Sequence, residues 1–255
     1  MTGLTKIGLS LLALLAFTSV APSIYAEPIS LRADAWCPIN CDPKSDKPGY
    51  MIEIAKAVFG PAGIPVDYQT LNWARAIADA RTGTYSGIIG AAKTDAPDFI
   101  YPDNELGLSS SCFFVKSEST WSYAGPDSLK DITLGVTKDY TYGDPLDAFI
   151  KANPSKMQVL AGEDTLPKNI KMAELDRIGA FVDDRNVVAY YMQQNKVTTI
   201  KQAGCLAATA SYIAFSPANP NAKKYAQMLS DGIVSLRQSG KLKTILDHYG
   251  LSDWK

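Results

Sequence analysis

The sequence predicts an α/β protein of two lobes, in which two parallel-rich sheets covered by helices are joined by a hinge of two strands. Three observations predict this fold class: two separate series of alternating strands and helices, an extended segment after each series, and a helical C-terminal part. Alternating strands and helices favour parallel sheets with right-handed crossovers. Open parallel sheets bind ligands beyond the carboxyl ends of their strands, so two facing sheets should enclose a cleft.

The first series of elements runs from residue 30 to residue 91. Tyr50, Ile54 and Val58 recur at the spacing of one helix face, and Asn72 is placed to cap a following helix. Strands and helices are therefore expected in turn at 30–35, 49–59, 64–71, 72–83 and 87–91.

The second series begins near residue 132. Its clearest member is the continuous apolar run 178–182, which is typical of a strand in a sheet covered on both faces. Strands are expected at 132–136, 157–160, 178–182 and 198–201, and helices at 143–152, 165–174 and 184–193.

Two extended segments, 109–116 and 211–216, are rich in aromatic and β-branched residues and are expected to cross between the lobes. Helices at 219–240 and 242–249 should then return to the first lobe. The expected boundaries are 27–112 and 214–255 for the first lobe and 113–213 for the second.

The first 26 residues are expected to be a secretory signal, which places the mature protein in the periplasm. Lys6 precedes an apolar run from Ile7 to Val20, and small and polar residues follow as far as Ala26. The run is too short and interrupted to span a bilayer comfortably. Cleavage is expected after Ala26, with a cut after Ser23 as the alternative, and no cysteine lies near either point to carry a lipid anchor.

The composition is that of an ordinary globular protein. Hydrophobic residues make up 46% of the chain and charged residues 20%, and the formal net charge is −1. This near-neutral balance gives no basic footprint for nucleic acid.

The even number of cysteines favours disulfides in an exported chain. Cys37 and Cys41 lie in one turn-rich segment and are expected to pair. A metal or redox site is the weaker alternative, because a second ligand cluster is missing and His248 is the only histidine. Cys112 and Cys205 then pair by elimination.

Four segments, in their order and spacing, resemble the family 3 extracellular solute-binding proteins, the polar-amino-acid group that serves bacterial ABC importers. They read KPGYMIEIAK at 47–56, NWARAI at 72–77, AFVDDR at 180–185 and LSDGIVSLRQSGKL at 229–242. The resemblance implies a type II periplasmic binding fold that closes around a small polar solute. It further implies a monomer that meets the membrane permease of an importer and needs no cofactor, metal or catalytic residue.

The resemblance also implies a ligand site. The residue at the position of Asp184 usually holds the ligand's ammonium, the loop before Gly143 supplies backbone donors for its carboxylate, and Trp36 or Tyr50 can stack on it. The arginine that usually clamps the carboxylate is missing, because its position in the segment 90–97 holds alanine or proline. Either Arg75 or Lys93 replaces it, or the ligand is not an ordinary α-amino acid.

Each candidate also has a structural alternative. The aspartates at 183 and 184 follow an apolar strand and could receive a cation or cap the next helix. The segment 140–143 could cradle an anion or form an ordinary turn, and the tryptophans could stack on a ligand or pack in the core. The candidate ligand-binding residues are Trp36, Tyr50, Trp73, Arg75, Ala91, Lys93, Thr94, Tyr140, Thr141, Tyr142, Asp183 and Asp184.

Two other functions are compatible with this sequence. The closed protein could dock on a sensor receptor in place of a permease. An enzyme resembling the dehydratases of this fold could use Asp183 and Asp184 as acid and base. The sequence shows no activated nucleophile, metal cluster or well-placed histidine for such a reaction.

Overall fold

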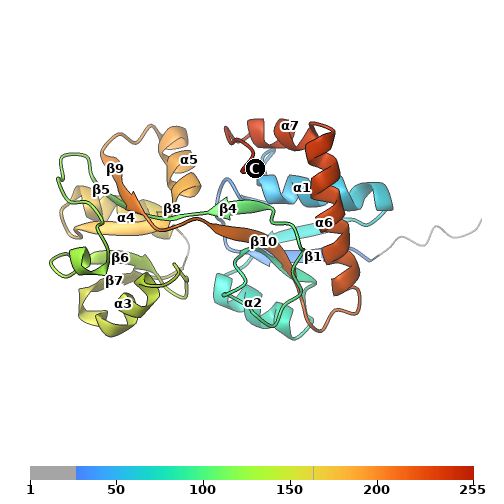
Figure 1. Cartoon of the computed structure of the whole chain (residues 1–255), viewed down its shortest axis with the longest axis horizontal. Coiled ribbons are helices and arrows are strands. Elements are labelled where there is room, and N and C mark those ends of the chain that lie inside the picture. Colours follow the sequence, from blue (N-terminus) through green and yellow to red (C-terminus); the bar gives the residue numbers. More distant parts are fainter. Residues whose placement is uncertain (1–26, 163) are drawn as a thin grey trace, which may run out of the picture.

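The computed structural model describes residues 27–162 and 164–255, so the expected signal at 1–26 lies outside the described residues. Two five-stranded sheets form two lobes that lie side by side and are linked by long crossing strands (Figure 1). Among the described helices, none is both long and apolar enough to cross a membrane.

The sheet of the first lobe has the strand order β2-β1-β3-β10-β4. The central β1 pairs in parallel with β2 and β3, as expected for a strand–helix–strand–helix–strand unit, while β10 pairs antiparallel with β3 and β4. These strands are β1 (Ile29–Ala33), β2 (Val66–Thr70), β3 (Gly87–Ala91), β4 (Gly107–Ser109) and β10 (Thr209–Phe215). The helices of this lobe are α1 (Tyr50–Phe59), α2 (Trp73–Arg81), α6 (Ala222–Gln238) and α7 (Lys241–Asp247).

The second sheet repeats this plan with the order β7-β6-β8-β5-β9. Strand β6 pairs in parallel with β7 and β8, and the hinge strand β5 pairs antiparallel with β8 and β9. The strands are β5 (Ser111–Lys116), β6 (Leu134–Thr137), β7 (Met157–Leu160), β8 (Ala180–Asp184) and β9 (Ile200–Cys205). The helices are α3 (Leu146–Ala152), α4 (Thr165–Glu174) and α5 (Arg185–Asn195). Short 3-10 helices lie at Gly60–Ala62, Pro126–Leu129 and Pro154–Lys156.

The hinge consists of two strands, as the sequence predicts. The chain passes from β4 to β5 at Ser110 and returns between β9 and β10. Cys112 lies opposite Cys205 in the register of β5 and β9, and the two form a disulfide at this crossing. The chain therefore leaves the first sheet at Ser110 and returns to it between residues 205 and 209. The expected lobe boundaries at 112/113 and 213/214 remain predictions.

The C-terminal helices return to the first lobe. Helix α6 packs on α1, α7 and β10. Its Tyr225 meets Phe59 of α1 edge-on at 5.8 Å between ring centroids, and Phe59 meets Phe215 of β10 at 6.3 Å. This aromatic cluster fixes β10, the returning hinge strand, against the body of the first lobe.

Several elements begin two or three residues later than expected, and two of these shifts bear on the site. Helix α3 starts at Leu146, not at residue 143, because Gly143 has a left-handed φ of 89° and Pro145 stands as the N-cap. Strand β8 spans 180–184, not 178–182, so both aspartates belong to the strand.

Candidate ligand-binding cleft

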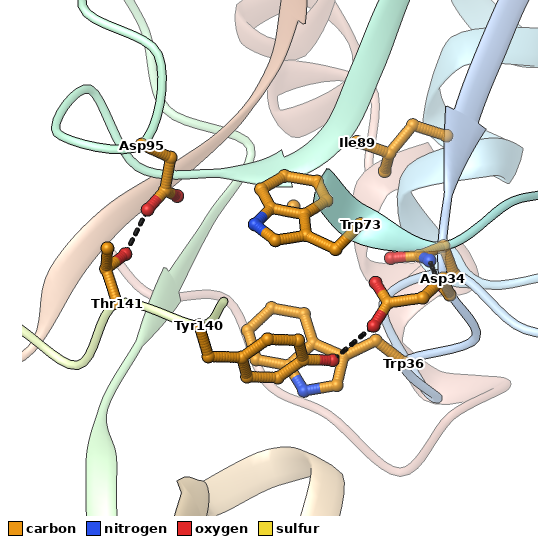
Figure 2. A pocket seen from close by; sticks show the side chains of 9 residues that line it. Asp34, Trp36, Trp73, Ile89, Asp95, Tyr140 and Thr141 are labelled. Atoms are coloured by element: carbon orange, nitrogen blue, oxygen red, sulfur yellow. Dashed lines mark hydrogen bonds between the residues drawn. The ribbon is translucent and has the colours of Figure 1, made fainter. Parts of the chain in front are cut away.

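A pocket lies where the two lobes meet, and residues of both lobes line it. It encloses about 380 Å³ of empty space, part of which is open to solvent. The first lobe contributes the loop after β1, the start of α2, β3 and the loop after β3, and the second lobe contributes the loop between β6 and α3. The lining residues are Asp34, Trp36, Asn40, Trp73, Ile89, Gly90, Asp95, Tyr140 and Thr141 (Figure 2).

The loop that follows β1 forms one wall of the pocket. Trp36 and Asn40 pair as an isolated bridge, and the Trp36 N–H donates to the Asn40 carbonyl at 2.7 Å. The Cys37–Cys41 disulfide closes the same turn. Gly49 has a φ of 117° and lies against the Ile39 carbonyl, where a Cβ would clash, so the loop can pack onto the start of α1. The side chain of Asn40 is thereby fixed in the wall.

The other wall depends on a helix cap. The Asn72 Oδ1 accepts a hydrogen bond from the Arg75 backbone N–H at 3.3 Å, which is the predicted N-cap of α2. The cap places Trp73, which is only 8% exposed, at the first position of the helix and in the pocket lining.

Among the described residues, and apart from the Ser109–Asp184 bond at the hinge, three side-chain hydrogen bonds cross the cleft from one lobe to the other. Tyr140 Oη donates to Asp34 Oδ2 at 2.5 Å, and Trp36 Nε1 donates to Asp183 Oδ1 at 3.2 Å. Thr141 Oγ1 donates to Asp95 Oδ1. The Tyr140–Asp34 and Thr141–Asp95 bonds are drawn on either side of the pocket in Figure 2. The structure therefore has its cleft closed.

The carboxyls at this junction are partly or fully buried: Asp34 and Asp95 are half-buried, and Asp183 is 4% exposed. Burial raises the pKa of Asp34 to about 6, although the hydrogen bond from Tyr140 acts in the opposite direction. Burial likewise raises the pKa of Asp183 to about 7, with hydrogen bonds from the Asp184 N–H and Trp36 opposing it. The pKa of Asp95 is also raised by burial. A positive charge in the pocket would favour the ionised form of each.

Asp184 is fully engaged by the protein and does not line the pocket. Its Oδ1 accepts from the backbone N–H groups of Asn186 and Val187 at 2.7 and 3.1 Å, which caps α5. Its Oδ2 accepts from the Ser109 hydroxyl and the Ser110 N–H at 2.8 and 2.9 Å. The geometry thus favours the capping alternative, in which Asp184 fastens the hinge to the second lobe, over an ammonium contact.

The backbone donors of the expected anion cradle before α3 already bind a carboxylate of the protein itself. The backbone N–H groups of Tyr142 and Gly143 both donate to the Asp147 carboxylate, each at 2.9 Å. The Tyr142 side chain is buried in the core of the second lobe, where its hydroxyl accepts from the Thr137 N–H at 2.7 Å. A ligand carboxylate would have to displace Asp147 to reach these donors.

Several other candidates lie away from the pocket lining. The Arg75 side chain is 70% exposed and pairs with Asp79 at 3.3 Å. Lys93 is exposed and lies over the Tyr212 ring at 5.3 Å, and Thr94 is exposed beside it. Ala91 and Tyr50 are buried in the first lobe, outside the lining.

The structure brings together four of the sequence candidates, namely Trp36, Trp73, Tyr140 and Thr141, with Asp183 just behind Trp36. Sequence reasoning missed other lining residues, namely Asp34, Asn40, Ile89, Gly90 and Asp95. The strand expected at 30–35 runs past Asp34, whereas β1 ends at Ala33 and leaves Asp34 directly after the strand, at the mouth of the cleft.

No protein-family model matches the sequence, and no curated protein is similar to it. Solved structures are similar over most of the chain. The arginine-, lysine-, histidine-binding protein ArtJ from Geobacillus stearothermophilus is 18% identical with a TM-score of 0.72, over 89% of this chain and 97% of that one. A chain from the work on glutathione import through GshT and the cystine ABC importer TcyBC of Streptococcus mutans is 16% identical with a TM-score of 0.73, over 88% and 94%.

A histidine kinase sensor domain with similarity to periplasmic binding proteins is 17% identical with a TM-score of 0.71, over 87% of this chain and 95% of that one. At these identities the likeness shows the fold. The chain has the two-lobed fold of periplasmic binding proteins, the fold class that its sequence predicts.

Proposed function

We propose that this chain is a periplasmic solute-binding protein that captures a small polar solute between its lobes and delivers it to the permease of an ABC importer. The observation that carries the proposal is the pocket itself, which both lobes line and three hydrogen bonds between the lobes close. A two-strand hinge allows such lobes to open and to close around a ligand.

The surroundings of the pocket support this role. The expected secretory signal and the two disulfides fit an oxidising compartment outside the cytoplasm. Several structural neighbours are described as binding proteins for amino acids, among them ArtJ. Polar groups converge on a pocket with aromatic walls, which is the usual composition of a small-molecule site.

The test is a thermal-shift screen against amino acids, polyamines and small carboxylates, followed by calorimetry. A solute at a hundred times its Kd should stabilise the protein by about 2.7 kcal/mol. Small-angle scattering should show an open ligand-free form that becomes more compact when the solute binds. If no solute raises the melting temperature and the dimensions do not change, the proposal is wrong.

Matched tryptophan variants locate the binding to the pocket. Trp73→Ala removes an aromatic wall and should weaken binding at least tenfold, because a buried aromatic side chain contributes on the order of 2 kcal/mol. Trp254→Ala is the control, because this residue lies outside the pocket lining and donates to Glu105. It should leave the Kd unchanged.

The second candidate is a sensing role, which the likeness to a histidine kinase sensor domain favours. The solute-loaded protein would then bind a signalling receptor, whereas an importer subunit should stimulate the ATPase activity of its permease in proteoliposomes.

We propose that the protein binds its solute without chemically converting it. Incubation with prephenate or arogenate should leave both compounds intact, and formation of a product would establish catalysis.

A further inference from the structure

The pocket carries negative charge and, among its lining residues, holds no lysine or arginine. Asp34 and Asp95 line it directly, and Asp183 lies behind Trp36. The two cations expected to enter the cleft, Arg75 and Lys93, are both exposed outside it. Its electrostatics therefore suit a cation and disfavour a carboxylate.

The unused hydrogen-bonding capacity of the lining points in the same direction. Asn40 is 1% exposed, and its Oδ1 is buried without a partner. The Asn40 Nδ2 donates to the Asp34 carbonyl oxygen at 2.5 Å. A carbonyl can only accept, so the amide nitrogen must face it, and the oxygen is left on the side of Gly90, which lines the pocket. A ligand N–H would satisfy this orphan acceptor.

Most donors at the pocket are already committed to protein acceptors. The hydroxyls of Tyr140 and Thr141 donate to Asp34 and Asp95, and the Trp36 indole N–H donates to Asp183. A ligand carboxylate would compete with these bonds and would face two aspartates. A ligand rich in N–H groups meets free acceptors.

The aromatic rings complete the environment for a cation. Trp36 and Tyr140 meet edge to face, with centroids 6.4 Å apart and planes at 80°. In Figure 2, Asp34 and the Asp95–Thr141 pair lie on opposite sides of these two rings and Trp73. Aromatic faces attract cations, most strongly when the cation is shielded from water.

We propose that the solute is a small organic ammonium or guanidinium compound with N–H donors and no carboxylate, an inference that rests on the proposed function as a solute-binding protein. The cation would lie among the aromatic rings, donate to Asn40 Oδ1 and neutralise Asp34. A ligand without a carboxylate also agrees with the missing arginine that the resemblance leads one to expect at Ala96 or Pro97.

Calorimetry at pH 7.5 with pairs of compounds that differ by one carboxylate tests the proposal. Agmatine should bind at least tenfold more tightly than L-arginine, and putrescine more tightly than L-ornithine. Choline should bind more weakly than putrescine, because it has no N–H for Asn40. Equal or tighter binding of the amino acids, or tighter binding of choline, overturns the ligand class.

A single variant tests the contact itself. Asp34→Asn keeps the shape of the side chain and should weaken amine binding about 30-fold, which corresponds to one charge-assisted hydrogen bond. Asp98→Asn is the control, because Asp98 pairs with Arg81 on the surface and should leave the Kd unchanged. Circular dichroism confirms that both variants fold, and an unchanged Kd in Asp34→Asn overturns the proposal.

The screen separates this inference from the proposed function. If none of the cations binds but a zwitterion or an acid does, the protein is a binding protein and the cation inference is wrong. If no compound binds and scattering shows no closure, both proposals are wrong.

Discussion

Two strand ends at the lobe junction carry the same chemistry and have different roles. Asp34 follows β1 in the first lobe, and Asp184 ends β8 in the second. Helix α5 begins at the next residue after Asp184, so its carboxylate accepts four hydrogen bonds from the helix and the hinge. After Asp34 the chain forms a loop of fifteen residues before α1 begins at Tyr50, and its carboxylate accepts one side-chain bond from Tyr140.

The difference shows what decides the role of an aspartate at a strand end. A helix that begins at once supplies backbone donors, and the carboxylate becomes a cap. When a loop follows the strand, the N–H groups of the next helix lie further along the chain and do not reach the carboxylate, which stays available to the cleft. The residues that follow the aspartate therefore decide whether its carboxylate caps a helix or faces the cleft. Each prediction below tests this distinction.

The largest effect on folding is expected at Asp184. Asp184→Ala leaves the buried N–H groups of Ser110 and Val187 without acceptors and should lower the free energy of unfolding by about 3 kcal/mol. Urea unfolding measures this loss. Asp184→Asn can still cap α5 and should lose less than half as much. If Asp184→Ala unfolds like the wild type, the capping role is wrong.

At Asp34, by contrast, removing the charge is expected to raise the free energy of unfolding of the ligand-free protein. Its pKa is raised from 3.8 to about 6, so folding disfavours the ionised form by at most about 3 kcal/mol. Because the side chain is only partly buried, we expect Asp34→Asn to stabilise the protein at pH 7 by about 2 kcal/mol. Such a gain together with weaker solute binding would mark a charge that is kept for function at the expense of stability.

The pH dependence of that gain provides its check. Below about pH 3, Asp34 is protonated in both the folded and unfolded states, so variant and wild type should unfold alike. As the pH rises towards 6 the unfolded state ionises first and the wild type loses stability, so the gain should grow and then stay constant. The neighbours that also titrate, Tyr140 and Asp183, are retained in the variant. A gain that is independent of pH would contradict the assignment to Asp34.

The loop after β1 should depend on its disulfide for both folding and binding. Replacing both Cys37 and Cys41 by alanine removes a cross-link between residues four positions apart, which should lower the free energy of unfolding by about 2 kcal/mol. The same change should weaken solute binding, because the turn positions Trp36 and Asn40 in the wall. Unchanged affinity would show that the hydrogen bonds of the turn suffice to shape it.

The sequence predicts the order of strands and helices well because each element carries its own local signal. Helical spacing at 49–59, the Asn72 cap and the apolar run before Asp183 depend on neighbouring residues alone. The element bounds near Gly143 and β8 differ by two or three residues, since backbone conformation and the partner strand decide them.

The site is harder to predict because it depends on contacts between the lobes. Tyr140 and Asp34 are 106 residues apart, and Trp36 and Asp183 are 147 apart. No local pattern shows that Asp147 occupies the backbone donors before α3, or that Asn40 keeps an acceptor free. Expectations transferred from resembling proteins name Asp184 because they assume that the same strand end meets the ligand, and they remain predictions until a ligand is bound.

The smallest effect is expected where β3 supports the loop wall. Gly90 has a φ of 83°, and a Cβ there would lie 3.3 Å from Trp36 Cε3. Gly90→Ala should therefore lower the free energy of unfolding by about 1 kcal/mol through the left-handed backbone and should move Trp36. Gly63→Ala is the matched control, because Gly63 has a left-handed φ of 69° and open space around its Cβ position, so it should have the same backbone cost without touching Trp36. A change of Trp36 fluorescence in Gly90→Ala alone would show that the Asp34 end of the cleft depends on this contact, whereas equal behaviour of the two variants would show that the disulfide loop holds its shape without β3.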